Sequence, residues 1–441
     1  MGALIACLGL TALLRAGGGE AEPLPTLLAG IPFTADRRPH ISPTSLLAPA
    51  VLAVVIVAAW RDVHIRLRWG TLLITAYVAS LAWTLALASV HGLSGLAGPL
   101  GNGPGYLSDV AAADADPVGF LRSYTHQGAH QGAHQGAASG SGTRAHPPGL
   151  VLVLWALTRL GIRAPSALGV VLTVVGAATV PLAAIAVRSL CHDRAARRFV
   201  PVLVLAPWAV WIPAADAVTA TLAAAFVTLG VIGSEPGRHL RWAAGCGLGI
   251  GVATLCGYAV PWLGITVVAT YFVRRRPLLN VITGGCVLLP LSVAAFLGFS
   301  WPDGLAVAHD QVVHATTHIP GSTAGVPAWV ARVPPGLAVV LAACGPTIIR
   351  AARRVRLTPG WPFLVGAVPA IGFGMVTGLT GAHPERSWLP FYCWLLVPAL
   401  APSPRPQGPG DMTQAGTLPL GLTTVGALSA IVARAFLPGT L

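Results

Sequence analysis

The sequence predicts an all-α fold, a polytopic transmembrane helical bundle that forms a single domain over residues 1–441. Of its residues, 54% are hydrophobic and only 9% are charged, and the mean hydropathy is +0.73. A soluble protein of this length needs far more charge to cover its surface. Apolar runs also recur along the whole chain, and a helix crosses the bilayer core with about 20 apolar residues.

The apolar runs divide the chain into about 12 to 13 expected spans, some of them short enough to be tilted or paired. The first run is interpreted as a span or anchor, because it lacks the basic leading region and the cleavage site of a signal peptide. The candidate spans are 1–14, 44–60, 70–90, 166–187, 199–215, 217–233, 243–257, 258–273, 278–299, 330–349, 361–380, 388–402 and 417–436.

The arginines predict how these spans are oriented. Basic residues of membrane proteins collect in cytoplasmic loops, so the net charge of +13 indicates topology and a lipid bilayer partner, not nucleic-acid binding. All the arginine-rich loops lie on the cytoplasmic side if successive spans alternate in direction and the run 150–163 enters the membrane as a short or re-entrant segment without crossing it. Five short loops contain the arginines that set this orientation: Arg61, Arg66 and Arg68; Arg188, Arg194, Arg197 and Arg198; Arg238 and Arg241; Arg274, Arg275 and Arg276; and Arg350, Arg353, Arg354 and Arg356.

The same topology places two large loops, 91–149 and 301–329, on the extracytoplasmic side of the plasma membrane. We expect any catalytic site to lie on that side. Both loops are expected to contain short interfacial helices. The first loop includes a low-complexity segment, 125–142, with three tandem HQGA repeats. Glycine in each repeat opposes a helix and favours a flexible linker over a metal site.

Three carboxylates within eight residues of the first outer loop are the candidate catalytic groups. Asp109, Asp114 and Asp116 lie among apolar positions, which predicts an amphipathic helix at the membrane surface. A carboxylate held there suits a general base. Asp116 precedes Pro117, which equally fits a helix N-cap followed by proline in the first turn. Asp109 has no such structural role and is the preferred base.

Five further residues are candidates for substrate binding. His146 stands in a His-Pro-Pro-Gly corner, where a helix is expected to begin because proline suits the first turn. Glu385 and Arg386 lie at the outer end of a late span, where charge is costly unless it is paired or binds a ligand. Asp216 is either a second outward carboxylate near the site or the N-cap of the next helix. Asp303 opens the second outer loop.

Two segments, YLSDVAAADADPVGFL at 106–121 and HPPGLVLVLW at 146–155, resemble the GT-C superfamily of integral-membrane glycosyltransferases, which use polyprenyl-phosphate sugars. More closely, the chain resembles poorly characterised membrane proteins of GC-rich bacteria. The shared features are the HPPG corner, a DGLA segment at 303–306 and an ER-x-WL helix at 385–389. The chain departs from the superfamily in its HQGA repeat and in lacking an acidic pair near the first span.

The resemblance implies a mechanism. An outer-loop carboxylate acts as base on the acceptor hydroxyl while the sugar leaves a lipid phosphate, usually with inversion. Carried onto this chain, the base is Asp109, with Asp114 and Asp116 as rivals. Arg386 would hold the lipid phosphate, because a planar guanidinium can donate two parallel hydrogen bonds to a phosphate. Glu385 would orient the phosphate or the sugar. His146 would lie at the mouth of the pocket.

Two other classes of function stay open. A transporter or exporter of a lipid-linked or small solute commonly has ionisable residues within its spans, whereas most charges here lie at span ends. A non-catalytic envelope assembly protein would show no transfer at all. No cofactor is expected; a divalent cation is left open, because His309, His314 and His318 match no specific metal-binding signature.

Overall fold

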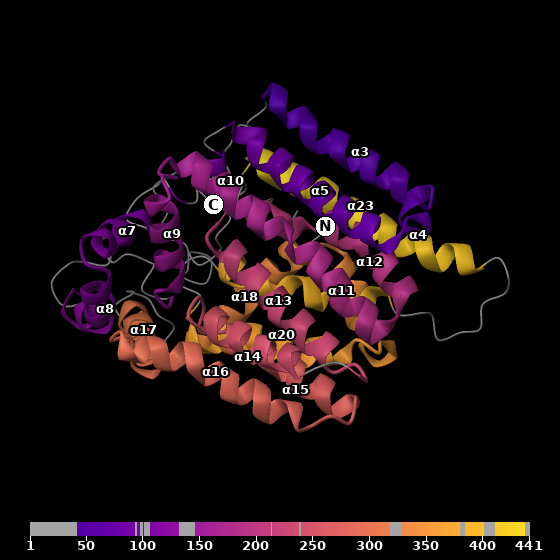
Figure 1. Cartoon of the computed structure of the whole chain (residues 1–441). Helices are drawn as coiled ribbons and strands as arrows, with labels where there is room; N and C mark the ends of the chain where they lie inside the picture. The colour runs from indigo at the N-terminus through magenta and orange to yellow at the C-terminus, as the bar shows by residue number, and fades with distance from the viewer. Residues whose placement is uncertain are drawn as a thin grey trace.

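The computed structural model describes residues 42–92, 95–97, 100, 106–131, 146–212, 214–237, 240–317, 328–379, 384–400 and 411–436. In these ranges every regular element is a helix, which confirms the predicted all-α bundle (Figure 1). The longer helices are α3 (Leu47–Trp60), α5 (Trp69–Ala88), α7 (Tyr106–Ala115), α8 (Pro117–Gln131), α9 (Gly149–Arg159), α10 (Pro165–Ala177), α11 (Thr179–Cys191), α12 (Asp193–Val204), α13 (Asp216–Gly233), α14 (Arg241–Thr254), α15 (Gly264–Val273), α16 (Leu279–Phe296), α17 (Trp301–Thr317), α18 (Ala328–Cys344), α19 (Thr347–Arg354), α20 (Trp361–Thr377) and α23 (Asp411–Phe436).

Short helices connect these elements. They are η1 (Pro43–Leu46), α4 (Val63–Arg66), η2 (Ser89–His91), η4 (Pro207–Trp211), η5 (Val260–Leu263), η6 (Val355–Leu357), α21 (Pro384–Ser387), α22 (Leu389–Leu395) and η7 (Val397–Leu400). Several begin at or next to a proline, which fits the first turn of a helix because no backbone donor is needed there.

Six described helical segments are long and apolar enough to cross a membrane, and a seventh would be a pair bent by 104° between Cys344 and Thr347. The remaining predicted spans in the described ranges form shorter helices, because prolines and glycines interrupt them. The run 258–273, for example, divides into η5 and α15. The predicted span 1–14 lies outside the described residues. The six long segments are Pro43–Trp60, Trp69–His91, Pro165–Cys191, Asp216–Gly233, Leu279–Phe296 and Pro419–Phe436.

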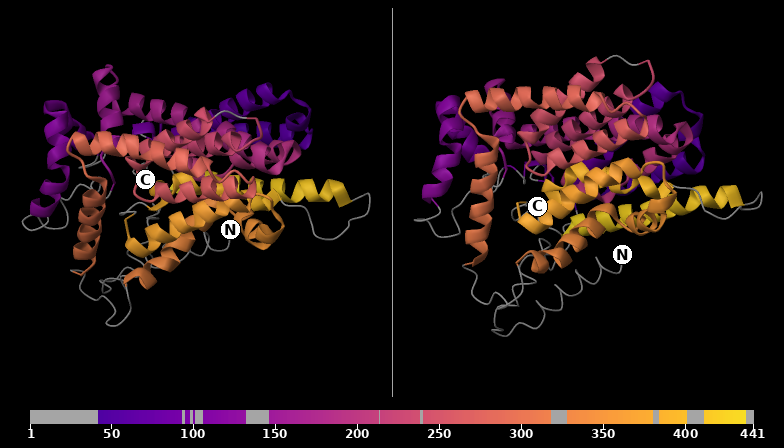
Figure 2. Two further views of the ribbon diagram at one scale, coloured as in Figure 1. Left: turned by 60° about the horizontal axis from the view of Figure 1, so that its bottom comes forward. Right: turned by 90° about the horizontal axis from the view of Figure 1, so that it is seen from below.

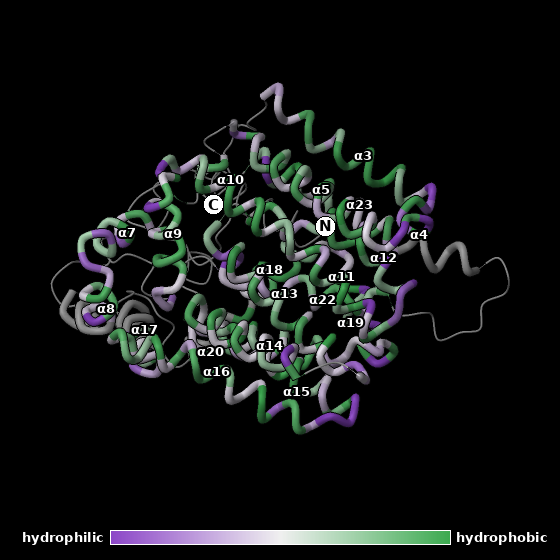
Figure 3. Tube along the Cα trace, in the orientation of Figure 1, coloured by the Kyte–Doolittle hydropathy of each residue, from purple (hydrophilic) through white to green (hydrophobic). Residues whose placement is uncertain are grey.

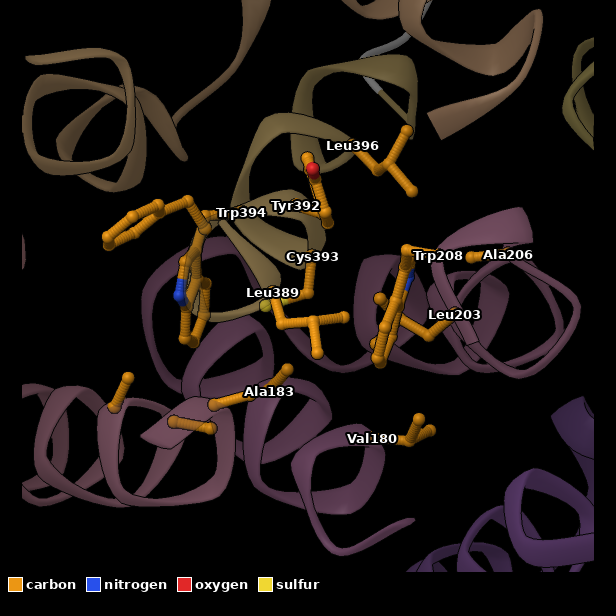
Figure 4. Packing of buried hydrophobic residues seen from close by; sticks show 14 of the residues in the cluster. Val180, Ala183, Leu203, Ala206, Trp208, Leu389, Tyr392, Cys393, Trp394 and Leu396 are labelled. Carbon is orange, nitrogen blue, oxygen red and sulfur yellow. The ribbon is translucent and has the colours of Figure 1, made fainter. Parts of the chain in front are cut away.

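A continuous apolar core fills the middle of the bundle. Every residue of α22 is buried within it. Figure 4 shows Leu389, Tyr392 and Trp394 of α22 in one cluster with Trp208 of η4 and residues of neighbouring helices. Trp394 also stacks on Phe363 with 4.9 Å between ring centroids. The short α22 is therefore held by packing on all sides.

Glycines allow α14 to pack tightly between α13 and α16. A Cβ atom at Gly247 would lie 2.2 Å from the carbonyl oxygen of Thr283, and one at Gly251 would lie 2.6 Å from that of Val287. The glycine-rich stretch of this helix therefore serves close helix packing.

The polar segments gather at two ends of the bundle (Figure 3). One end contains the arginine-rich loops, which hydrogen bonds fasten together: Arg197 Nη1 donates to the carbonyl of Leu67 at 2.7 Å, and Arg276 Nη1 donates to that of Glu235 at 2.8 Å. The other end contains α7, α8, α9 and α17. Figure 2 shows α17 beside α8, across the direction of α16. The arginine-rich loops thus share an end, as predicted.

The first outer loop contains more helix than its composition suggested. The structure continues α8 to Gln131, through the first copy of the HQGA repeat. The expectation that glycine would prevent a helix there is therefore wrong for this copy, because α8 has already begun at Pro117 and extension costs less than nucleation. The rest of the repeat lies outside the described residues.

Candidate functional site

The His-Pro-Pro-Gly corner joins α9 to the end of α14. The helix begins at Gly149 with Pro148 as its N-cap, as predicted. The Gly149 N–H donates to the carbonyl oxygen of Leu255 at 2.8 Å. A Cβ atom at position 149 would lie 2.2 Å from that oxygen, so only glycine permits the approach. The Tyr124 hydroxyl donates to the carbonyl of His146 at 2.8 Å and ties α8 to the same corner.

A small cavity of about 20 Å³ lies beside this corner. The His146 ring forms one side, and its Nε2 lies 3.5 Å from the Ser387 hydroxyl of α21. The first turn of α13 and the break between α14 and η5 form the rest of its polar wall. Its polar lining consists of His146, Asp216, Thr219, Cys256, Tyr258 and Ser387.

Three of these polar groups are buried against the cavity. Asp216 is 6% exposed and is the first residue of α13. The N-cap is Ala215, and no side chain caps this helix, so the N-cap interpretation of Asp216 is wrong. The hydroxyls of Thr219 and Tyr258 are buried without a hydrogen-bond partner. A buried polar group left unpaired costs about 1–3 kcal/mol, so these hydroxyls do not stabilise the packing of the wall.

Tyr106 of α7 borders the same region from the opposite side. Its ring centroid lies 6.5 Å from that of His146. Burial raises the pKa of the Tyr106 phenol well above its ordinary value, the negative charge of Asp216 raises it further, and the positive charge of Arg386 opposes both. The phenol therefore stays protonated and can donate a hydrogen bond. Asp216 and Arg386, which are far apart in the sequence, thus both act on Tyr106.

The preferred base, Asp109, lies on α7, the helix that begins with Tyr106. It follows Tyr106 by three residues, so both side chains are on one face of the helix. It is 9% exposed, unlike the other carboxylates of its segment. Asp109 is not among the cavity-lining residues that the structure describes, and its catalytic role stays a prediction.

The rivals Asp114 and Asp116 have other contacts. Asp114 Oδ1 forms an exposed ion pair with Arg159 Nε of α9 at 2.7 Å and accepts from Trp155 Nε1 at 3.1 Å. Asp116 Oδ1 accepts from the Gly119 N–H at 2.9 Å, which confirms the predicted helix cap. Both carboxylates are exposed and fasten α7, α8 and α9 to one another.

The remaining predicted residues differ in their surroundings. Glu385 is completely buried in α21, and Arg386 is half-buried beside it. The structure thus brings both next to Ser387 and the cavity. Asp303 lies exposed in the first turn of α17 and does not line the cavity. Within the described ranges, no three His, Cys, Asp or Glu side chains come together as a metal site.

Sequence reasoning missed five residues of the site, namely Tyr106, Thr219, Cys256, Tyr258 and Ser387. Each stands in or beside an apolar run, where a single polar side chain is ordinary. One signal was available: Thr219 follows Asp216 by three residues, so a helix that starts at Asp216 presents both on one face. Nothing local indicates Tyr258.

No protein-family model and no curated protein matches the sequence. Among solved structures, the chain is similar to ArnT from Cupriavidus metallidurans bound to undecaprenyl phosphate, with 15% identity and a TM-score of 0.45, over 71% of this chain and 70% of that one. Apo ArnT from the same organism is 16% identical with a TM-score of 0.40, over 67% of this chain and 56% of that one. The Archaeoglobus fulgidus oligosaccharyltransferase complex with Zn and sulfate is 12% identical with a TM-score of 0.43, over 66% of this chain and 45% of that one.

Proposed function

We propose that this chain is an integral-membrane glycosyltransferase that moves a sugar from a polyprenyl-phosphate donor to an acceptor hydroxyl. The observation that carries the proposal is the cavity beside His146, where buried polar groups meet at one end of an apolar helical bundle. A polyprenyl phosphate has its charged head at the membrane surface and its tail in lipid. A charged pocket at the ends of membrane-length helices matches that shape.

The orientation follows from the arginine-rich end of the bundle. Basic loops face the cytoplasm, so the end with α7, α9 and the cavity faces the outside of the plasma membrane. The donor is then used on the extracytoplasmic side, and the acceptor reaches the cavity from there.

The residues take complementary parts in this proposal. Asp109 accepts the proton of the acceptor hydroxyl, whose oxygen forms the new bond to the anomeric carbon. The bond between that carbon and the phosphate oxygen breaks, and its electron pair stays on the polyprenyl phosphate. Arg386 stabilises the charge that develops on this leaving group. Asp216 and His146 line the cavity and position the sugar or the acceptor through hydrogen bonds.

The test is transfer of radiolabelled sugar from polyprenyl-phosphate donors in purified membranes. With Asp109→Asn, transfer is expected to fall by about 10²–10⁴-fold, the range for a lost general base. The matched control is Asp303→Asn, which removes an exposed carboxylate from the same end and is expected to keep full activity. Asp216→Asn is measured alongside.

The outcomes separate the alternatives. Normal transfer in Asp109→Asn with loss in Asp216→Asn would assign the base to the cavity wall. Normal transfer in both variants would place the chemistry elsewhere. No transfer by the wild-type chain with any donor would refute the proposal in favour of a transporter or an assembly protein.

A further inference from the structure

A sharp bend separates α18 from α19, and the sequence Cys344-Gly345-Pro346 produces it. Gly345 lies in the left-handed region with φ +64°, and its N–H donates to the carbonyl of Leu341 at 2.9 Å. Glycine is the residue that most readily ends a helix in this conformation, and a proline after it cannot continue the helix. Pro346 then serves as the N-cap of α19. The segment Thr347–Leu357 consequently leaves α18 at 104°.

One face of α19 is fixed to the rest of the bundle. Thr347 and Ala351 are buried, and because they are four residues apart they lie on one side of the helix. The Thr347 hydroxyl lies 3.4 Å from that of Thr423 in α23. Arg350 Nε donates to the carbonyl of Ala399 in η7 at 2.7 Å. These contacts hold α19 in place and determine which of its side chains face outward.

The opposite face of the segment is exposed and combines apolar with basic side chains. Ile349 is about half exposed. Arg353 and Arg356 are also exposed, and they follow Ile349 by four and seven residues, so all three lie on one face. Such a face is typical of a helix that lies at a membrane surface, with apolar side chains toward the acyl chains and basic ones toward the headgroups. Two further exposed apolar side chains of the segment are Val355 and Leu357.

The two exposed arginines are not neutralised within the described residues. Arg353 and Arg356 have no ion pair and no side-chain hydrogen bond there. Residues 311–384 contain no Asp or Glu, so the segment has no acidic neighbour along the chain. By contrast, Arg197 in the arginine-rich end donates to the carbonyl of Leu67 and fastens two loops together. The charge of Arg353 and Arg356 is therefore available to an outside partner.

We propose that the segment Thr347–Leu357 lies on the membrane surface at the arginine-rich end and binds anionic phospholipid headgroups through Arg353 and Arg356. The apolar helix α20 begins at Trp361, directly after the segment, and Trp361 is exposed. Tryptophan is enriched at membrane–water interfaces, so the segment lies at the level where lipid surrounds the protein. A soluble acidic protein would match the arginines but not the exposed apolar side chains among them.

Photo-crosslinking to lipid tests this assignment. The full chain carries p-benzoylphenylalanine in place of Ile349, in nanodiscs with equal amounts of phosphatidylglycerol and phosphatidylcholine. Mass spectrometry gives the ratio of the two lipid adducts, and the wild-type arginines should favour the anionic lipid. Arg353→Gln and Arg356→Gln should each lower that ratio about fivefold, which is what one basic residue near an anionic membrane surface contributes.

The matched control is the double variant Arg122→Gln with Arg163→Gln. It removes two exposed arginines from the opposite end of the bundle, one in α8 and one just after α9. Compared with Arg353→Gln combined with Arg356→Gln, it removes the same charge and should keep the wild-type ratio. Salt at about 1 M should lower the wild-type ratio toward that of the latter variant, because salt screens exposed charges.

Three results would overturn the inference. They are equal adduct yields for the two lipids in the otherwise wild-type chain, an unchanged ratio in Arg353→Gln combined with Arg356→Gln, and the absence of any lipid adduct, which would favour a soluble acidic partner. If that double variant does not fold, a wild-type ratio that high salt leaves unchanged overturns the inference instead. No sugar transfer is needed for these measurements, so the inference and the proposed function are tested independently.

Discussion

Arginines at the two ends of the bundle are used in opposite ways. At the loop-rich end, Arg197 donates to the carbonyl of Leu67 and Arg276 to that of Glu235, and each guanidinium fastens two loops together. In the last turn of α23, Arg434 is more deeply buried yet has an unpartnered Nε, and its Nη2 donates to the carbonyl of Gly95 at 3.4 Å. A satisfied arginine stabilises the fold, whereas burial of an unsatisfied one costs stability.

The hydroxyl groups follow the same division. Threonines within the spans donate to backbone carbonyls. Thr228 donates to Leu182 on the neighbouring helix α11, and Thr270 donates to Thr266 on its own helix. Around the cavity, Thr219 and Tyr258 have no such partner. The difference teaches that one end is built for stability, whereas the other retains polar groups at a cost in stability.

The largest effect on stability is expected at the corner that closes the cavity. Gly149→Ala places a methyl group against the carbonyl of Leu255 and breaks the hydrogen bond from the Gly149 N–H. We expect a loss of about 1–3 kcal/mol, typical of overpacking, together with loss of transfer. Thermal unfolding in detergent measures it. Gly284→Ala is the control: its Cβ atom would meet no other atom within 4 Å, and alanine favours the helix by up to about 1 kcal/mol.

Arginine substitutions compare the two ends directly. Arg197→Met removes hydrogen bonds to the carbonyls of Ile65 and Leu67 and an ion pair with Asp193. Hydrogen bonds from charged groups contribute about 1.5–3 kcal/mol, so a loss of that size is expected. Arg434→Met should leave the stability of the ligand-free chain unchanged or raise it. A large destabilisation by Arg434→Met would break the comparison.

Removing one hydroxyl from the cavity wall should separate stability from binding. Tyr258→Phe deletes a buried, unpartnered oxygen, so we expect stability to stay the same or rise by up to about 1 kcal/mol, while sugar transfer falls. The control is Tyr271→Phe, whose hydroxyl lies 3.2 Å from that of Thr283; it should lower stability without affecting transfer. Lower stability in Tyr258→Phe would show that its hydroxyl is structural.

The smallest effect is expected for the ion pair between α7 and α9. Arg159→Gln breaks the contact with Asp114, and both side chains are about half exposed. Exposed pairs contribute about 0–1 kcal/mol, and salt screens them. Unfolding of the variant and wild type at low and high salt should show a difference that vanishes with salt. A large effect on transfer would assign Asp114 a function beyond this contact.

Much of the architecture could be predicted because it depends on local chemistry. Apolar runs interrupted by proline and glycine become helices wherever they pack, so every described span falls on a helix. The HPPG corner begins α9 because proline fits a first turn, and Asp116 caps α8 because a carboxylate before proline reaches free N–H groups. The number of membrane-length helices was harder to predict, since breaks such as the one between η5 and α15 depend on packing.

The candidate site depends on contacts between distant segments, and no local pattern encodes them. Asp216 could cap a helix or face a cavity, and only the packing of α13 against the HPPG corner placed it at the cavity. His146 and Ser387 lie far apart in the sequence, and nothing in either sequence neighbourhood says that their side chains meet. The sequence by itself therefore determined the class of protein, its helices and their caps, which follow from hydropathy and backbone chemistry. Tertiary structure alone decided which polar groups are satisfied and which are left facing a cavity, because that depends on what burial brings within hydrogen-bonding distance.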